Sequence, residues 1–163
     1  MEFAVQGAPI VTAACHCASC RKAAAGFAAL PGAPQVLNAE GGVDFTLYRK
    51  DRIAFREGYD LLRGYRLAPT SPTRRVLAGC CDTPMFLEFQ KGHWLSIYRD
   101  RFGDAAPVVD LRVMTGDRED GGAFEDDIPS YRKHSGKFMW RLLSAWAAMG
   151  FRAPTLAPIE AAR

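Results

Sequence analysis

Three cysteines fall within six residues near the start of the chain, in the run Cys15-His16-Cys17-Ala18-Ser19-Cys20. Zinc prefers thiolate sulfur at about 2.3 Å in tetrahedral geometry. Cysteines spaced one and two residues apart on a turn can reach one ion without straining the backbone. We therefore predict that Cys15, Cys17 and Cys20 bind one metal ion per chain, and that this ion is Zn²⁺.

The fourth ligand decides what such a site does. Structural zinc usually has four protein ligands, whereas three protein ligands leave one position for water or a substrate. Cys80 and Cys81 are the other two cysteines of the chain and the candidates for closing the site. If one of them binds, the zinc is structural; if neither does, the fourth position is open to water or a substrate thiol. His16 lies between two ligands, so its side chain is expected to point away.

The composition predicts one domain spanning residues 1–163, because 48% of the residues are hydrophobic and 24% are charged. A net charge of +3 does not call for a nucleic-acid partner or an anionic membrane. Residues 1–75 carry ten Lys and Arg against six Asp and Glu, so we expect a small anionic ligand near the cysteines.

The chain opens without the pattern of a signal peptide, and its longest apolar stretches are shorter than the roughly 18 residues needed to cross a bilayer. We therefore expect a cytoplasmic protein with no membrane partner. In that reducing compartment, an odd number of cysteines fits metal binding better than disulfides.

Short runs of apolar residues between turn residues predict a mainly β domain of mostly antiparallel strands. Two strands around a turn are expected within residues 1–14, the second of them (Ile10–Ala14) leading into the cysteines. Residues Arg21–Leu30 fit either a short helix or an irregular loop. Gly103–Pro107 and Thr115–Gly122 are expected to form loops. The other predicted strands are Gln35–Asn38, Asp44–Tyr48, Leu61–Arg66, Arg74–Ala78, Met85–Phe89 and Leu95–Tyr98.

Residues 135–150 predict a C-terminal helix, with Ser135 as N-cap, Lys137–Met149 as the body and Gly150 as the stop. An apolar stripe of this kind usually packs on a core, so we expect the helix to dock on the sheet; the alternative is a homodimer interface. The residues of the stripe are Phe138, Met139, Leu142, Leu143, Trp146 and Met149.

Three segments carry a resemblance to a known family. The run Cys15–Lys22 with Gly26-Phe27 resembles the signature of the glutathione-dependent formaldehyde-activating enzyme family, which includes centromere protein V. Thr73–Leu77 with Cys81–Met85 is similar to the family's Arg-x-Phe-Cys-x-x-Cys-Gly-Ser-Pro-Leu element. Asp126–Tyr131 is similar to its closing Asp-Gly-Leu-Pro-x-Phe element. The three segments occur in the family's order.

The resemblance implies a β-tent fold, a twisted β-sheet fold with two zinc sites. The catalytic type of site corresponds to Cys15, Cys17 and Cys20. The structural site is expected to be lost, because no cysteine precedes Cys15 and Ala78 stands where the first cysteine of Cys-x-x-Cys should be. Cys81 is the one matched ligand, and Asp82 replaces the usual glycine beside it. Apolar residues, among them Phe3, Val5 and Leu77, would have to supply the lost stability.

The activity that the resemblance implies is a carbon–sulfur lyase reaction in reverse, in which glutathione adds to formaldehyde to give S-hydroxymethylglutathione. Four basic residues are our candidates for binding the carboxylates of glutathione: Arg21, Lys22, Arg74 and Arg75. His93 and His134 are candidates for proton transfer.

Three functions fit the sequence. The first is an enzyme of carbon–sulfur chemistry that binds glutathione or a similar thiol. The second is a non-catalytic binding or structural module in which zinc fixes a loop. The third is a redox module whose thiolates oxidise and release zinc. We rank the enzyme first because the three cysteines are retained.

Overall fold

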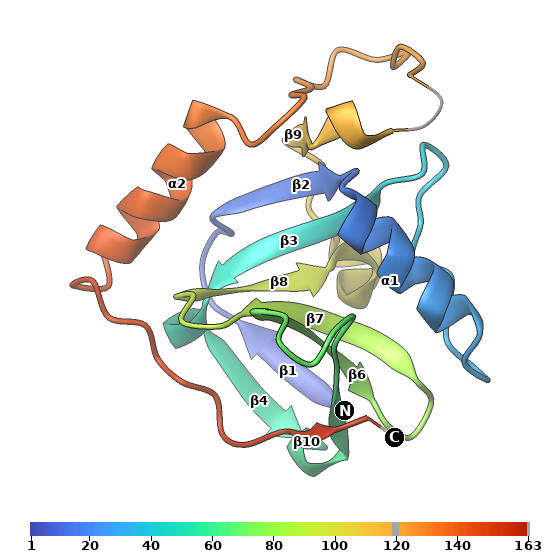
Figure 1. The fold of residues 1–163 in the computed structure, drawn as a ribbon. Helices are drawn as coiled ribbons and strands as arrows, with labels where there is room; N and C mark the ends of the chain where they lie inside the picture. Colours follow the sequence, from blue (N-terminus) through green and yellow to red (C-terminus); the bar gives the residue numbers. More distant parts are fainter. Residues whose placement is uncertain (119–120, 163) are drawn as a thin grey trace.

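The computed structural model describes residues 1–118 and 121–162. Within them, an eight-stranded sheet has the order β10-β5-β6-β7-β8-β3-β2-β9 (Figure 1). Neighbouring strands are antiparallel, except that β2–β9 and β5–β10 are parallel. The strands are β2 (Val11–Cys15), β3 (Val43–Arg49), β5 (Leu62–Tyr65), β6 (Thr73–Ala78), β7 (Thr83–Phe89), β8 (Trp94–Tyr98), β9 (Leu111–Val113) and β10 (Glu160–Ala161). The prediction of a mainly β domain with a C-terminal helix is confirmed.

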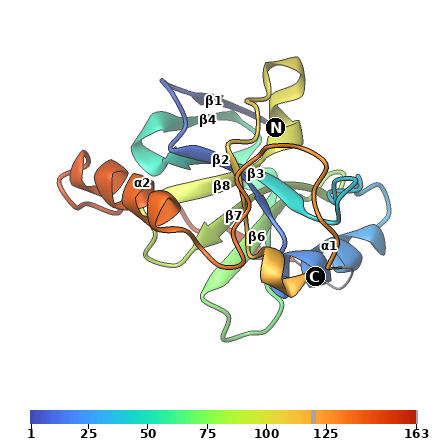
Figure 2. The same ribbon diagram turned by 90° about the horizontal axis from the view of Figure 1, so that it is seen from above.

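The two faces of the large sheet are covered differently. On one face lies a small antiparallel sheet of β1 (Glu2–Val5) and β4 (Ile53–Glu57), whose Phe3, Val5 and Phe55 pack on the core of that face (Figure 2). The helices α1 (Ala18–Ala28) and α2 (Gly136–Ala147) lie beside the other face, towards opposite ends of its strands (Figure 1). A second apolar core lies beneath these helices.

Helix α1 settles the segment for which a helix and a loop were both open. It begins at Ala18, three residues before Arg21, so that Cys20 lies in its first turn. Its alanine-rich sequence favours a helix, and Ala23, Ala24 and Phe27 are buried against the sheet. Gly26 leaves room for Tyr65 against the helix, because a Cβ at this position would lie 2.8 Å from the tyrosine hydroxyl oxygen and the tyrosine side chain would have to shift.

Helix α2 is capped as predicted but docks through a narrower face. The Ser135 hydroxyl accepts a hydrogen bond from the backbone N–H of Phe138 (3.0 Å), and Gly150 ends the segment with a φ of 61°. Phe138, Leu142 and Met149 are buried, whereas Met139 and Leu143 are 53% and 46% exposed. The predicted six-residue stripe is therefore too wide, because successive helical side chains are 100° apart and only one side meets the sheet.

The exposed apolar side of α2 leaves the homodimer as an untested prediction. No helix within the described residues is long and apolar enough to cross a membrane.

Several strand predictions differ from the structure. The predicted strand Gln35–Asn38 is wrong: the segment forms one isolated bridge, between Leu37 and Val43. Its end is a turn, because the Asn38 side-chain oxygen accepts hydrogen bonds from the backbone N–H groups of Glu40 and Gly42. Strands β4, β9 and β10 were not predicted; β9 and β10 have three and two residues, too few to show an alternating pattern.

The first predicted loop, Gly103–Pro107, overlaps the end of the 3₁₀ segment Arg99–Ala105, and the second contains the 3₁₀ segment Thr115–Asp117. Residues 119 and 120 of the second loop lie outside the described residues.

Candidate metal centre

The three cysteines lie where β2 ends and α1 begins. Their Sγ atoms all lie within 4.8 Å of one another, and those of Cys15 and Cys20 are 3.7 Å apart. At the corners of a tetrahedron with bonds of about 2.3 Å, thiolate sulfurs are about 3.8 Å apart. We call Cys15, Cys17 and Cys20 the cysteine cluster; its geometry and its donor atoms can hold one metal ion.

The start of α1 holds the cysteine cluster together. Cys17 is the N-cap of the helix, and its Sγ accepts a hydrogen bond from the backbone N–H of Cys20 (3.4 Å). The Ser19 hydroxyl lies 3.2 Å from the same sulfur. Free N–H groups and the helix dipole favour negative charge at a helix N-terminus, so this position stabilises a thiolate.

The three thiols of the cysteine cluster differ in pKa. Hydrogen bonds with Cys15 and Cys20 keep the pKa of Cys17 far below its ordinary value, against the effect of burial. The same contacts with Cys17 and Cys20, together with burial, raise the pKa of Cys15. For Cys20, the contact with Cys15 lowers the pKa, but the contact with Cys17 and burial outweigh it and raise the pKa to about 12. Metal binding must therefore displace protons from Cys15 and Cys20.

His16 lies away from the cysteine cluster, as expected. Its side chain is fully buried and its ring packs against that of Phe124, with ring centroids 5.4 Å apart. Gly42 covers the ring so closely that a Cβ there would lie 2.7 Å from it. His16 is thus part of the packing behind the metal centre.

Cys80 and Cys81 lie in a different part of the molecule. They are exposed in the turn between β6 and β7, with Sγ atoms 3.6 Å apart, beside a cavity of about 600 Å³ that Phe3 and Val5 also line. Neither sulfur belongs to the cysteine cluster. Asp82, which follows them, has a φ of 52°, so the turn keeps the left-handed conformation that suits glycine.

The cysteine cluster opens into a cavity of about 430 Å³ between the sheet and α2, here called the central cavity. All three cysteines line it at one end, and His134 lines it beside α2. Most of its other walls are apolar: Ala13, Phe45, Leu47, Leu87, Phe89, Trp94, Val113, Phe138, Met139 and Leu142. Sequence patterns identified several of these residues as strand or helix residues but gave no sign that they share a cavity.

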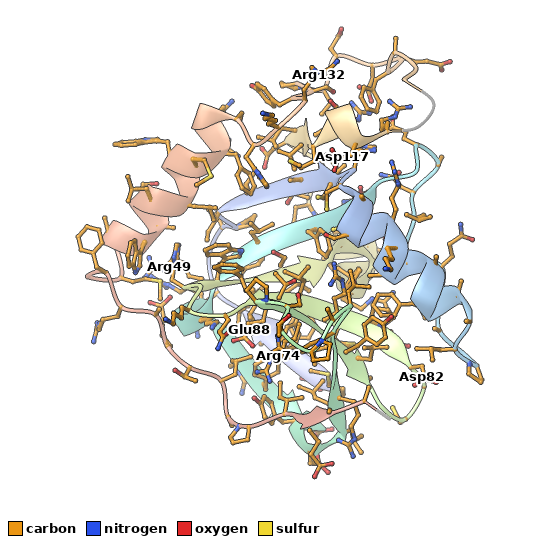
Figure 3. All side chains as sticks on the ribbon, in the orientation of Figure 1. Arg49, Arg74, Asp82, Glu88, Asp117 and Arg132 are labelled. Atoms are coloured by element: carbon orange, nitrogen blue, oxygen red, sulfur yellow. The ribbon has the colours of Figure 1, made fainter. Side chains whose placement is uncertain are left out.

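The two adjacent arginines of β6 lie on opposite faces of the sheet. The Arg74 Nε donates a hydrogen bond to Glu88 (2.7 Å), and Glu88 also accepts one from the buried Lys50 (2.7 Å). Figure 3 shows Arg74 and Glu88 side by side. Arg74 is therefore held in an ion network that lies outside the central cavity.

Arg75 lines the central cavity together with the cysteine cluster. Its side chain is almost completely buried, and its Nη2 donates a hydrogen bond to the backbone carbonyl of Ser19 (3.0 Å). Its Nη1 has no hydrogen-bond partner among the described residues. A buried guanidinium N–H without an acceptor is costly, so this position favours an acceptor on a bound ligand.

Arg21, Lys22 and His93 do not line the central cavity. The Arg21 guanidinium donates a hydrogen bond to the backbone carbonyl of Asp117 (2.5 Å), near the start of α1 (Figure 3). Lys22 is exposed on α1. His93 is buried under α2, where its ring stacks on that of Trp146 with centroids 5.8 Å apart. Of the four basic residues predicted to bind substrate, the structure brings Arg75 to the cysteine cluster.

Neither a protein-family model nor a curated protein matches the chain. The interpretation of the site therefore rests on its geometry.

Proposed function

We propose that the protein binds one Zn²⁺ through Cys15, Cys17 and Cys20 and presents its fourth coordination position to the sulfur of a small thiol. The observation that carries this proposal is that all three cysteines line the central cavity. The two other cysteines lie beside a different cavity. A ligand in the central cavity can therefore reach the fourth position without displacing a protein ligand.

The proposed reaction is the one that the family resemblance implies: a thiol, with glutathione as the first candidate, adds to formaldehyde. The thiol gives its proton to solvent, a carbon–sulfur bond forms, the carbonyl π electrons move to oxygen, and that oxygen takes a proton from water. Bound zinc would lower the pKa of the thiol. Arg75 would offset the net negative charge of zinc with three thiolates, and the apolar walls would exclude water from the thiolate.

A second function is supported by a separate observation. Cys20 is buried in the core beneath the helices, and Cys17 caps α1, so a metal on the cysteine cluster would join the end of β2 to the start of α1. A metal in that position stabilises the fold whether or not a ligand enters the cavity. The alternative is therefore a non-catalytic module that zinc stabilises.

The experiment that separates the two functions uses protein loaded with Zn²⁺ or Co²⁺. Glutathione is titrated into the cobalt form while the visible spectrum is followed, and the zinc form is mixed with ¹³C-formaldehyde and glutathione to measure the rate of adduct formation by NMR. The enzyme predicts a changed cobalt spectrum and a faster rate than without protein. An unchanged spectrum and rate would exclude glutathione, and if no other small thiol changed the spectrum, the structural module would remain.

A Cys17→Ser variant is the control for the metal centre, and Cys80→Ser is the matched control elsewhere on the chain. Both the spectral change and the rate enhancement should disappear with Cys17→Ser and persist with Cys80→Ser. If Cys80→Ser abolished them as well, the proposed site would be wrong.

A further inference from the structure

The walls of the central cavity are unusual for a site that binds a polar peptide. Rings of Phe45, Trp94 and Phe138 and aliphatic chains such as Leu47 and Leu142 make up most of its surface. Pockets with such walls gain affinity by burying the hydrocarbon part of a ligand and use a few polar groups to orient it. The walls thus favour a ligand with an apolar body.

Arg75 is the one Lys or Arg side chain that lines the central cavity among the described residues. It is 1% exposed, and its Nη2 donates a hydrogen bond to the backbone carbonyl of Ser19, the residue next to Cys20 (3.0 Å). One hydrogen-bond donor of its guanidinium, Nη1, has no partner among the described residues. This donor can bind one negatively charged oxygen next to the metal centre.

Glutathione matches this cavity poorly. It carries two carboxylates and one ammonium group, whereas no acidic side chain of the described residues lines the cavity to receive the ammonium. Arg74, the neighbouring candidate for the second carboxylate, is held by Glu88 on the other face of the sheet. Burying charged groups without partners is unfavourable, so most of a glutathione molecule would have to stay in solvent.

We propose that the ligand of the central cavity is a small apolar thiol with a single carboxylate: its sulfur at the metal, its carboxylate on Arg75 and its hydrocarbon body against the aromatic walls. The sulfur–metal contact rests on the proposed function. The pairing of an apolar body with Arg75 rests on the cavity alone.

The test uses cobalt-loaded protein and three thiols: 2-mercapto-3-phenylpropanoate, 2-phenylethanethiol and glutathione. Each is titrated while the cobalt spectrum is followed. The mercaptocarboxylate should bind roughly tenfold or more tightly than either of the others, because it alone supplies both the apolar body and the single charge. Equal or tighter binding of glutathione would overturn the inference and leave the proposed function standing. Equal binding of 2-phenylethanethiol would overturn the role of Arg75.

Arg75→Met tests the carboxylate contact, with Arg74→Met as the matched control on the opposite face of β6. Arg75→Met should abolish the preference for the mercaptocarboxylate over 2-phenylethanethiol, compared on samples whose metal content has been measured and matched. Arg74→Met should keep the preference. Loss of the preference in both variants would contradict a specific contact. If Arg75→Met does not fold, the ranking of the three thiols on the unaltered protein still decides the proposal.

A sulfur-free probe separates this inference from the proposed function. 3-Phenylpropanoate has the same body and carboxylate, and calorimetry should detect its binding to the unaltered protein and a loss of about tenfold with Arg75→Met. If it binds in this way while none of the thiols changes the cobalt spectrum, the proposed function fails and the inference about the cavity holds. If it does not bind, the inference fails whatever the thiols do.

Discussion

The two groups of cysteines in this protein have similar sulfur separations but different surroundings. The Sγ atoms of Cys15 and Cys20 are 3.7 Å apart, and those of Cys80 and Cys81 are 3.6 Å apart. The cysteine cluster brings together three side chains from the end of a strand and the start of a helix. Two of them are partly buried and one is buried. The pair consists of two adjacent residues in an exposed turn. A short distance between sulfurs is therefore not enough for a metal centre.

What separates the two regions is the set of groups that surround the sulfurs. At the cysteine cluster, the Cys17 sulfur accepts a hydrogen bond from the backbone N–H of Cys20 at the start of α1, where the helix dipole favours negative charge, and Arg75 adds a cation beside it. At the pair, Cys81 has the Thr83 hydroxyl as its neighbour (3.1 Å), and this contact lowers the pKa of the Cys81 thiol. The first arrangement suits a bound metal, and the second suits a reactive thiol.

The largest expected effect is on metal affinity. Replacing Cys17 by serine removes one of three thiolates, so the Zn²⁺ affinity should fall by roughly 1,000-fold, whereas Cys81→Ser should leave it unchanged. Competition with a chromophoric chelator measures both values, and circular dichroism checks that each variant is folded. If the Cys81→Ser protein no longer retained zinc, Cys81 would take part in metal binding and the proposed difference between the two regions would be wrong.

The pH dependence of metal binding comes next. The raised pKa values of Cys15 and Cys20 mean that both thiols keep their protons at neutral pH, while the lowered pKa of Cys17 means that it does not. Zinc binding should therefore release about two protons, and its affinity should fall by about 100-fold for each unit of decreasing pH near neutrality. Isothermal titration calorimetry in buffers of different ionisation enthalpy measures the proton number.

Release of no protons would show that the three thiols are already ionised and that the inferred sharing of protons is wrong. The Cys81→Ser variant is the control, because its proton release on zinc binding should equal that of the unaltered protein.

Alkylation should distinguish the two regions by rate. In the zinc-loaded protein at pH 7, iodoacetamide should modify Cys80 and Cys81 while the cysteine cluster is protected. Thr83→Val removes the hydroxyl that lowers the pKa of Cys81, so the rate at Cys81 should fall several-fold. Mass spectrometry of digested samples follows each site.

Ser19→Ala is the matched control, since Ser19 contacts the Cys17 sulfur in the other region. It should leave the rate at Cys81 unchanged. A rate at Cys81 that did not respond to Thr83→Val would show that the hydroxyl does not control this thiol.

The smallest expected effect concerns the turn that carries the exposed pair. Asp82 has a φ of 52°, which costs a residue with a side chain more than glycine, so Asp82→Gly should raise the free energy of unfolding by about 0.5 kcal/mol. Chemical denaturation measures this value. Ala106→Gly is the comparison at an ordinary φ of −63° and should destabilise the protein. Destabilisation by Asp82→Gly would mean that side-chain contacts of Asp82 outweigh the backbone preference.

The sequence predicted the local features of the site better than its surroundings. Two predictions depended only on residues a few positions apart, and the structure agrees with both. They are the meeting of Cys15, Cys17 and Cys20 and the N-cap at Ser135. The strand predicted at residues 35–38 failed because the Asn38 side chain forms a turn with nearby N–H groups, a local interaction that outweighs the β-forming residues before it.

The sequence by itself determined that three thiols meet at one point, because a few residues on a turn fix the distances between their own side chains. Tertiary structure decided what those thiols face. Arg74 and Arg75 are equivalent in the sequence, yet strand β6 sends one to Glu88 and the other into the central cavity, since successive side chains of a strand point to opposite faces. Which face is the cavity depends on where α2 docks, more than 60 residues later along the chain.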